Sequence, residues 1–541
     1  MRIKPRLRVV SQSTPNRVAL AGSTLFIIGA TLASTLLGFT REVVNARYYG
    51  TQWQMDTFLA AAVVPTILFG VFNGALVTAL LPTFSEYLAH GEDEEAWRLA
   101  NTVINALFLI LVVCALLGYA SAPWYVPVIA HGFSGHQLSE AVRMTRWLMP
   151  SIIAVSLSGV LTAVLNAQHR FRATALTGVA LNFVTIGTVL FFNHRLGINA
   201  LVIGTALGLV AQMLVQIPPL LFSGKYRLSI DLHHPGLHRI GQVLGPIMVG
   251  SAAGQTALLF DRYFASTLSS GYIAGMNYAT KLVNFPQQIF AVAIATVIFP
   301  LLATQFASSD RRGIGQSVSV GLRLVMLIAI PSACALTVLA TPIIQTLFER
   351  GTFGPTATTL CAHLVPYAAA GLVALAANVV LSRVCFACRE TGWAVGTSIV
   401  AVALNIILSL AWLPTLGARG LLLANSLSQT LQAALLLMIV VRVTRGVDWS
   451  GLALSALKIA LAACCMVGAL HWITALGVHP TGAFVSRAWF LFGQIAIGAL
   501  VFLAVARILQ VEELPLVFRL VLEKFVRNIP SAPDNHEAPI A

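Results

Sequence analysis

The sequence predicts an all-α integral membrane protein, and three observations lead to this fold class. Of the 541 residues, 57% are hydrophobic and only 10% are charged, and the mean hydropathy is +0.84. Soluble globular domains carry about 25% charged residues, so this chain lacks the polar surface that soluble domains would need. Apolar runs of about 20 residues, long enough to cross a bilayer, recur from end to end. None of these runs alternates apolar and polar residues as a membrane β-strand does.

Fourteen of these runs are predicted to be transmembrane helices, because in lipid every backbone polar group must be paired within its own segment. In chain order they cover residues 18–47, 54–88, 97–122, 142–168, 173–192, 198–222, 239–268, 272–306, 315–348, 357–385, 392–413, 418–442, 452–477 and 486–509. The gaps between them are short and leave no room for a folded domain outside the membrane.

The basic residues predict the orientation of the helices. About two thirds of the 33 Lys and Arg residues lie before the first span, in even-numbered loops or after the last span, which places both termini in the cytoplasm. The net charge of +14 is then a topology signal and an attraction to anionic lipid. No nucleic-acid partner is expected, because the basic residues are scattered over many loops. Arg323 and Lys458, near cytoplasmic helix ends, are expected to extend towards the headgroups.

An internal repeat organises the spans. The segment GFTREVVNARYYG aligns with LFDRYFASTLSSG at a shift of about 220 residues, and the alignment continues through the following spans. Aligned pairs are Arg41 with Arg262, Gly50 with Gly271, Pro65 with Pro286, Gly132 with Gly351, and Gly197 with Gly417. Each copy holds an even number of spans, so both copies enter the membrane in the same sense. Transporters built from such parallel repeats bind their substrate between the two halves.

The repeat predicts the following organisation: a basic cytoplasmic N-terminus at residues 1–17, a first six-helix lobe at 18–222, a cytoplasmic linker at 223–238, a second six-helix lobe at 239–442, two extra helices at 451–510 and a cytoplasmic tail at 511–541. The two extra helices have no counterpart in the repeat.

Ionisable side chains inside the spans are the candidate functional residues: Arg41, Glu42, Asp56, Asp261, Arg262 and Lys281. Charges at such depth are costly and usually face a water-filled cavity. Two other interpretations stay open, namely that Arg41 extends to the interface and that the charges form structural ion pairs. Adjacent residues project about 100° apart on a helix, so Arg41 is not expected to pair with Glu42, nor Asp261 with Arg262.

Pro65 and Pro286 occupy matching positions inside two of the spans. Proline removes a backbone hydrogen bond and bends a helix. The two residues are therefore candidate hinges, with a fixed kink as the alternative.

At these residues the chain resembles the MurJ (MviN) lipid II flippase family, within the multidrug/oligosaccharidyl-lipid/polysaccharide exporter superfamily. The matching motifs are LLGFTREVVNARYYG with Asp56 after it, MNYATKLVNFPQQIFAVAIATVIFPLLA, and LFERGTFGPTAT. The resemblance implies a MATE-like fold in the bacterial plasma (inner) membrane. It implies an alternating-access transporter, not an enzyme, that moves a polyprenyl-pyrophosphate-linked precursor of peptidoglycan from the inner to the outer leaflet. The lipid tail would lie in a groove formed with the last two helices.

The resemblance also implies roles for particular residues. Arg41 matches an arginine of the family's cavity, Glu42 stands where the family often has Asp, and Lys281 matches a cavity arginine. Asp56 matches the acidic residue that opens the second span. An ion-coupling site, for Na⁺, would draw on Asp261, Asn405, Ser409 and Asn425. No metal site or cofactor is expected, apart from Na⁺ or the membrane potential as the driving force.

Departures from the family pattern keep other functions open. Thr35 stands where many members have another arginine, and Thr280-Lys281 replaces their Asp-Arg, so the predicted cavity holds fewer cations. One alternative is a flippase or exporter of another lipid-linked glycan or a small amphiphile. A second is a degenerate scaffold protein in envelope assembly. The expected partners are the lipid-linked substrate and membrane lipids. The protein is expected to act as a monomer, with the cell-wall synthesis machinery as a possible associate.

Overall fold

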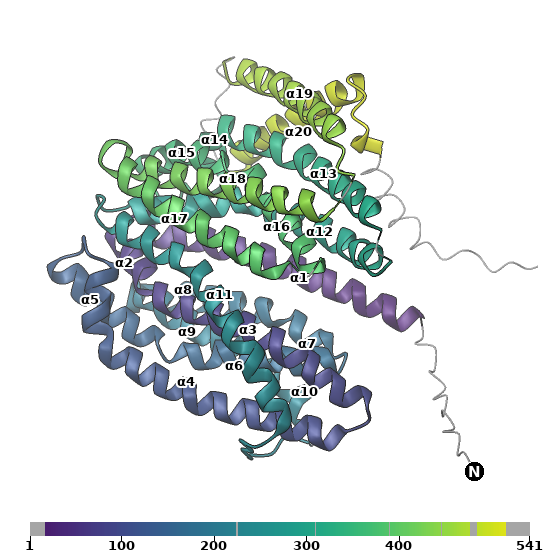
Figure 1. Ribbon diagram of the computed structural model, residues 1–541. Helices are drawn as coiled ribbons and strands as arrows, with labels where there is room; N and C mark the ends of the chain where they lie inside the picture. Colours follow the sequence, from purple (N-terminus) through teal and green to yellow (C-terminus); the bar gives the residue numbers. More distant parts are fainter. Residues whose placement is uncertain are drawn as a thin grey trace, which may run out of the picture. The chain divides into compact units, whose positions relative to one another are not determined.

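The computed structural model describes residues 17–222, 225–308, 310–388, 390–444, 446–475 and 484–515. Within these ranges the regular secondary structure is α-helical and no strand is present, which confirms the predicted fold class. The predicted basic N-terminus therefore lies outside the described residues except for Arg17, and so does the predicted tail beyond residue 515. Figure 1 traces the helices in chain order from purple to yellow.

The described residues form two compact units, each held together by its own contacts. The first unit is Met1–Ala274 with Arg350–Phe353, and the second is Gly275–Glu349 with Gly354–Ala541. The first contains α1 (Arg17–Tyr49), α2 (Trp53–Ala61), α3 (Val63–Ala89), α4 (Asp93–Ile129), α5 (Gly135–Leu148), α6 (Ser151–Ala167), α7 (Phe171–Ala175), α8 (Thr177–Leu196), α9 (Asn199–Leu214), α10 (Ile217–Leu221), α11 (Pro235–Ser266) and the first turn of α12 (Tyr272–Ala307). The second contains the rest of α12, α13 (Arg311–Val338), α14 (Ala340–Leu347), α15 (Pro355–Ala369), α16 (Leu372–Ala387), α17 (Thr391–Leu416), α18 (Ala418–Val443), α19 (Trp449–Ala475) and α20 (Phe484–Ile508).

Each predicted span falls on a helix or on two consecutive helices. Among the described residues, 10 helices are long and apolar enough to cross a membrane, and α15 and α16, bent by 46°, make an eleventh span if they are taken together. The remaining three predicted spans lie on the long helices α1, α11 and α12. The protein is thus a multi-pass membrane protein, and the count of fourteen stays a prediction.

Helix α11 packs on α3 and α4 and belongs to the first compact unit, whereas the sequence repeat assigned it to the second lobe. The two divisions differ because a repeat records the order of the spans along the chain, whereas a compact unit records which helices touch. The lobe boundaries derived from the repeat stay a prediction.

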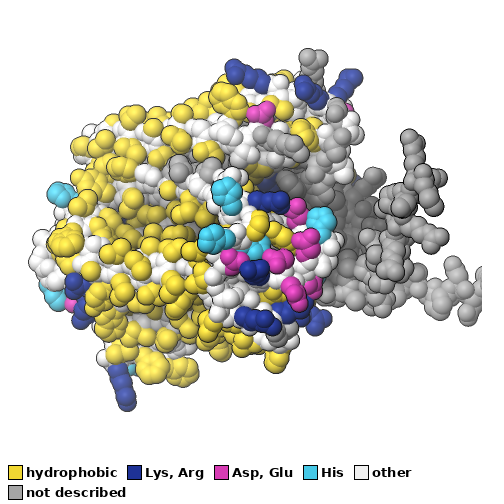
Figure 2. Space-filling model, turned by 60° about the horizontal axis from the view of Figure 1, so that its bottom comes forward, with side chains coloured by type: hydrophobic (Ala, Val, Ile, Leu, Met, Phe, Trp, Pro, Cys, Tyr) yellow, Lys and Arg dark blue, Asp and Glu magenta, His cyan; other side chains and the backbone are white. Residues whose placement is uncertain are grey.

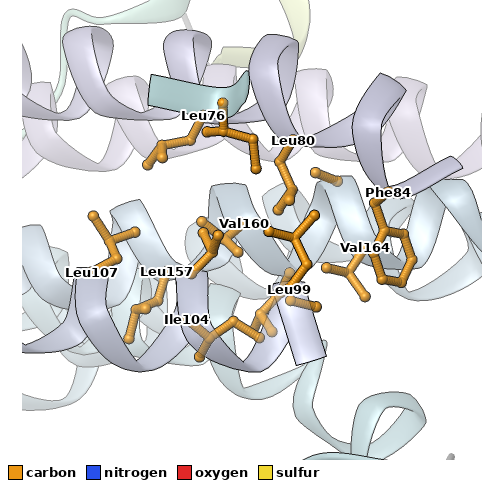
Figure 3. Close-up of a cluster of buried hydrophobic side chains, with 14 of the residues drawn as sticks. Leu76, Leu80, Phe84, Leu99, Ile104, Leu107, Leu157, Val160 and Val164 are labelled. Carbon is orange, nitrogen blue, oxygen red and sulfur yellow. The ribbon is translucent and has the colours of Figure 1, made fainter. Parts of the chain in front are cut away.

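The core of the first unit lies where α3, α4 and α6 meet. Leu76, Leu80 and Phe84 recur every fourth residue along α3, so they share one face of the helix. They meet Leu99 from α4 and Val160 from α6 in a cluster of buried side chains (Figure 3). Small side chains let the helices approach closely, which favours association in a membrane; those buried in this cluster are Ala79, Ala96, Ala100 and Ala163.

The backbone supports the predicted repeat. Gly197 joins α8 to α9 with φ 53° and ψ −134°, and Gly417 joins α17 to α18 with φ 56° and ψ −132°. These nearly equal angles lie in a region that side chains disfavour and glycine adopts readily. In each case the two joined helices pack against each other as a hairpin. The same turn therefore occurs at aligned positions of the two copies.

Large apolar side chains remain exposed outside the cores. On α4, Leu109, Val113, Leu116 and Leu117 are 54–64% exposed. Figure 2 shows a face on which hydrophobic side chains cover much of the surface and charged side chains gather locally. A chain with contiguous apolar surface of this kind requires lipid around it.

Candidate functional site

Arg41 and Glu42 form an ion pair in the last third of α1. The Arg41 Nη2 atom lies 3.0 Å from Glu42 Oε1, and the two side chains are 24% and 9% exposed. The expectation that these adjacent residues would not pair was wrong, because the long arginine side chain spans the angle between them. The guanidinium has five N–H donors, and this pair uses one of them, so Arg41 retains donors for a ligand.

Asp56 lies on α2 and is buried, with 2% of its surface exposed. Its Oδ2 atom accepts a hydrogen bond from the backbone nitrogen of Gly271 at 2.5 Å, and its Oδ1 atom accepts one from Ala274 at 2.7 Å. A carboxylate at a helix N-terminus pairs N–H groups that have no partner within the helix and complements the helix dipole. Asp56 thus fixes the start of α12, and its assignment to substrate binding stays a prediction.

Arg262 lies on α11, half-buried, and interacts electrostatically with the carboxylates of Asp261 and Asp56. Its Nε atom is buried and has no hydrogen-bond partner among the described residues. A buried donor without a partner costs about 1–3 kcal/mol. The structure therefore brings together three of the predicted charges, with one hydrogen-bond donor left for another group.

Four turns of the first unit meet in a cluster. In the sequence, glycines of these turns served only to align the two copies of the repeat, and the contacts between the turns were not predicted. We call the turns 50–52, 130–134, 267–271 and 350–353 the four-turn cluster. The backbone nitrogen of Thr352 donates to Arg47 O at 2.9 Å, and the nitrogen of Gly132 donates to the Ser266 hydroxyl at 3.1 Å. The first contact links α1 to the turn after α14, and the second links α11 to the turn after α4.

Glycine is required where these turns touch. Gly271 and Gly351 have φ of 92° and 59°, and a Cβ atom at either would collide with the carbonyl oxygen of Thr51 or Arg47, respectively. At Gly50, whose φ is 54°, a Cβ atom would lie 2.7 Å from Thr352 O. Three aligned glycines of the repeat thus serve the close packing of this cluster.

The remaining candidates lie in the second unit. Lys281 on α12 is exposed. On α17, the buried Ser409 hydroxyl donates to Asn405 Oδ1 at 3.0 Å, and Asn425 lies half-buried on α18. Asp261 belongs to the first unit. Within the second unit the structure shows a contact between Asn405 and Ser409, and the ion-coupling set as a whole stays a prediction.

The two proline positions differ in the structure. A break between α2 and α3 precedes Pro65, and the Ala61 carbonyl, which the proline leaves without its helical donor, accepts a bond from the Thr145 hydroxyl at 3.3 Å. Helix α12 continues without a break through Pro286. The proposed hinge motion stays a prediction at both positions.

An apolar groove of about 510 Å³ lies between α13, α19 and α20 in the second unit. Leu327, Pro331, Met466, Leu470 and Phe502 are among the residues that line it, and Ser332 supplies a single hydroxyl. Gly498 lets α20 approach α19, since a Cβ atom there would lie 3.2 Å from Leu470. The groove is formed with the last two helices, as the family resemblance implied.

Ion pairs hold α19 and α20 on this unit. Arg487 at the start of α20 pairs with Glu349 at 3.2 Å, next to α14. Arg323 of α13, with a side chain only 12% exposed, contacts Asp448 and lies 3.6 Å from Glu513. The structure shows that the Arg323 guanidinium is ion-paired, and its extension towards the headgroups stays a prediction. Its partners Asp448 and Glu513 are far from α13 in the sequence, so sequence patterns near Arg323 do not reveal these ion pairs.

Comparisons with known proteins agree with this description. The family model described as "Lipid II flippase MurJ" matches residues 45–493. A probable lipid II flippase MurJ from Vibrio cholerae is 29% identical over 511 residues, which cover 91% of this chain and 96% of that protein. The lipid II flippase MurJ from Burkholderia cenocepacia is 29% identical over 425 residues, covering 76% of this chain and 82% of that protein.

Solved structures lead to the same family. A lipid II flippase MurJ in an inward closed conformation superposes with a TM-score of 0.77 at 25% identity, over 92% of this chain and 99% of that one. A multidrug resistance MATE family transporter of the MOP superfamily superposes with a TM-score of 0.64 at 13% identity, over 77% of this chain and 98% of that one. The second likeness shows the fold alone.

Proposed function

The chain belongs to the lipid II flippase MurJ family, and from this premise we propose that it moves lipid II from the inner to the outer leaflet of the bacterial inner membrane for peptidoglycan synthesis. It is a transporter and not an enzyme. The observation that carries the proposal is the buried Arg262 Nε atom, which has no hydrogen-bond partner among the described residues. A guanidinium binds phosphate oxygens through paired, charge-assisted hydrogen bonds, so the pyrophosphate of the substrate supplies the missing acceptor.

Arg41 is the second cation of the proposed headgroup site. Its pairing with Glu42 holds the guanidinium in place, and its 24% exposure leaves it accessible from solvent. Lys281, which is exposed, would meet the headgroup during the transport cycle. Asp56 orders the helix ends around this site through its contacts with Gly271 and Ala274.

The polyprenyl tail is proposed to lie in the apolar groove between α13, α19 and α20. Burial of a long hydrocarbon chain needs a lining without charges, and the groove offers one. The ion pairs of Arg487 and Arg323 support this assignment, because they keep α19 and α20 in place beside α13.

The four-turn cluster is proposed to be the closed outer end of the transport pathway. The distribution of basic residues predicts that both termini are cytoplasmic, and with this orientation the turns would lie on the periplasmic side. Release of the headgroup would require the contacts of Arg47 with Thr352 and of Ser266 with Gly132 to separate. The contacts are hydrogen bonds between neutral groups and glycine packing, which can open without breaking buried ion pairs.

The driving force is proposed to be Na⁺ or the membrane potential. Oxygen ligands suit Na⁺, and the pair of Asn405 and Ser409 offers two of them. The protein is expected to act as a monomer, with the cell-wall synthesis machinery as its partner.

The test is a flipping assay in liposomes with lipid II and a second polyprenyl-linked glycan, run with and without a Na⁺ gradient. Arg262→Ala should abolish lipid II transport, and Arg239→Ala is the matched control, because Arg239 is on the same helix with a side chain 61% exposed. Transport of the other glycan but not of lipid II would make that glycan the substrate. If neither lipid moved, and Arg262→Ala still supported growth in a strain depleted of its own flippase, a scaffold role would replace the proposal.

A further inference from the structure

A cationic cavity lies in the first unit, between α4 and α5, and none of the candidate transport residues lines it. Its volume is about 480 Å³. The residues that define its chemistry are Pro123, Pro127, Ser139, Arg143, Arg146 and Trp147. Two arginines, an aromatic ring and two prolines from within α4 thus share one small cavity beside the turn 130–134.

Proline in α4 positions one of these arginines. Pro123 has no N–H, so the carbonyl of Tyr119, one turn earlier, loses its usual helical donor. The Nε atom of Arg146 donates to this carbonyl at 3.2 Å, and its guanidinium lies 5.2 Å from the centre of the Tyr119 ring. The sequence of α4 therefore creates an anchoring point for a cation from α5.

The cavity carries net positive charge. Arg143 pairs with Glu140 at 2.5 Å and also donates to the Asn199 side chain at 3.2 Å. Arg146 has no carboxylate partner among the described residues. Two guanidinium groups thus face one carboxylate. In the part of the chain that the structure describes, the terminal nitrogens of Arg146 have no hydrogen-bond partner, so they can bind an anion.

The cavity lies at the end of a lipid-facing stripe. Leu109, Leu116 and Pro123 are spaced by seven residues, about two helical turns, so they lie on one face of α4; all three are exposed. From Tyr119 to Leu109 the helix rises about 15 Å, which is half of a hydrocarbon core about 30 Å thick. Trp124 and Trp147, which are 77% and 47% exposed, lie at this end of the stripe, as aromatic residues do at the membrane interface.

We propose that this cavity binds the phosphate of an anionic phospholipid, with one acyl chain lying along α4. Arg146 and Arg143 hold the phosphate oxygens, because a guanidinium matches them in charge and geometry. Leu116 and Leu109 contact the acyl chain over the depth of one leaflet. The predicted orientation places this leaflet on the periplasmic side. Because the lipid touches α4 and α5 on either side of the turn 130–134, it also stabilises one turn of the four-turn cluster.

The experiment is a titration of the delipidated full-length protein with phosphatidylglycerol, followed by native mass spectrometry and thermal unfolding. The Arg143→Gln/Arg146→Gln variant should bind the most tightly held phosphatidylglycerol about tenfold more weakly, a difference of about 1.4 kcal/mol, and lose the rise in Tm that the lipid causes. Arg98→Gln is the control, because Arg98 has a side chain 55% exposed and is ion-paired away from this cavity. Ser139→Phe leaves both arginines intact and fills the cavity, so it should weaken binding as well.

Undecaprenyl diphosphate is titrated in parallel, because it carries the same phosphate chemistry on a different lipid. Equal phosphatidylglycerol affinity in the wild type, the double variant and Ser139→Phe would overturn the proposal. Weaker binding of undecaprenyl diphosphate alone would also overturn it and would assign the cavity to the transported lipid. Loss of transport is not part of the readout, so the result does not depend on the proposed function.

Discussion

The carboxylate of Asp56 lies 2.5 Å from the backbone nitrogen of Gly271, and this hydrogen bond joins α2 to the turn after α11. The two residues are more than 200 positions apart in the chain, yet the contact is a helix cap of ordinary chemistry. Its position at the start of α12 makes Asp56 a structural residue whatever its role with substrate. Separating these two roles is the first task for mutagenesis.

Asp56→Ala should lower the free energy of unfolding by about 1–3 kcal/mol, because the N–H groups of Gly271 and Ala274 lose their acceptor in a buried place. Asp56→Asn keeps one oxygen and should cost less. Thermal unfolding in detergent measures both changes. A normal Tm in Asp56→Ala together with failed transport would instead mark the residue as a substrate contact.

Gly351→Ala should destabilise the four-turn cluster by more than about 1 kcal/mol, since an L-residue is strained at positive φ and its Cβ atom would strike Arg47 O. Gly354→Ala is the control three residues away, where φ is −88° and a Cβ atom would meet nothing within 4 Å. The reactivity of a cysteine introduced at Thr352 towards a membrane-impermeant reagent reports the opening. Equal reactivity in both variants would show that the cluster does not depend on this glycine.

Ala499→Phe should fill the apolar groove and lower lipid II transport more than about tenfold, or about 1.4 kcal/mol, without lowering Tm. Ala499 lines the groove and is exposed, so the larger ring enters empty space. The neighbouring Leu500, 66% exposed and outside the groove lining, provides the control Leu500→Phe. Undiminished transport by Ala499→Phe would show that the polyprenyl tail does not lie in this groove.

The pair of Arg487 and Glu349 should show a coupling energy of about 0.5–3 kcal/mol in a double-mutant cycle, since both side chains are largely buried, at 29% and 15% exposed. Alanine variants of each residue and of both, unfolded thermally, complete the cycle. Additive losses would mean that the ion pair does not hold α20 in place.

The pKa of Asp448 is held below its ordinary value of 3.8 by hydrogen bonds from the Gly451 N–H and the Ser450 hydroxyl and by the Arg323 cation. A carboxyl whose pKa is lowered on folding stabilises the folded state above its unfolded pKa, and this contribution is lost as the pH falls through the folded pKa. The Tm should therefore fall more steeply below about pH 4 in the wild type than in Asp448→Asn. Parallel curves for the two proteins would contradict this.

The fold was largely predictable, because membrane insertion depends on local composition. Runs of apolar residues mark the helices, and the aligned glycines at 197 and 417 mark turns with the same backbone angles. Such features need no knowledge of which helices touch.

The site was predictable in part. Placement of Arg41, Asp56 and Arg262 inside or beside the spans came from the sequence, but their partners did not. The pair of Arg41 and Glu42 forms because side-chain length outweighs helical angle, which spacing alone does not reveal. The bonds of Asp56 and the ion pairs of Arg323 join distant segments, and only the tertiary structure brings those segments together.

The crosswise contacts of the four-turn cluster bear on the ancestry of the chain. Arg47 of the first copy meets Gly351 of the second, and Ser266 of the second meets Gly132 of the first. The two glycines are an aligned pair, and Arg47 and Ser266 lie two residues from aligned positions. In a homodimer of a half-length protein, these two contacts would be the same isologous contact, repeated on both sides of the twofold axis. Gene duplication and fusion of such a dimer would leave both in a single polypeptide, each then free to diverge.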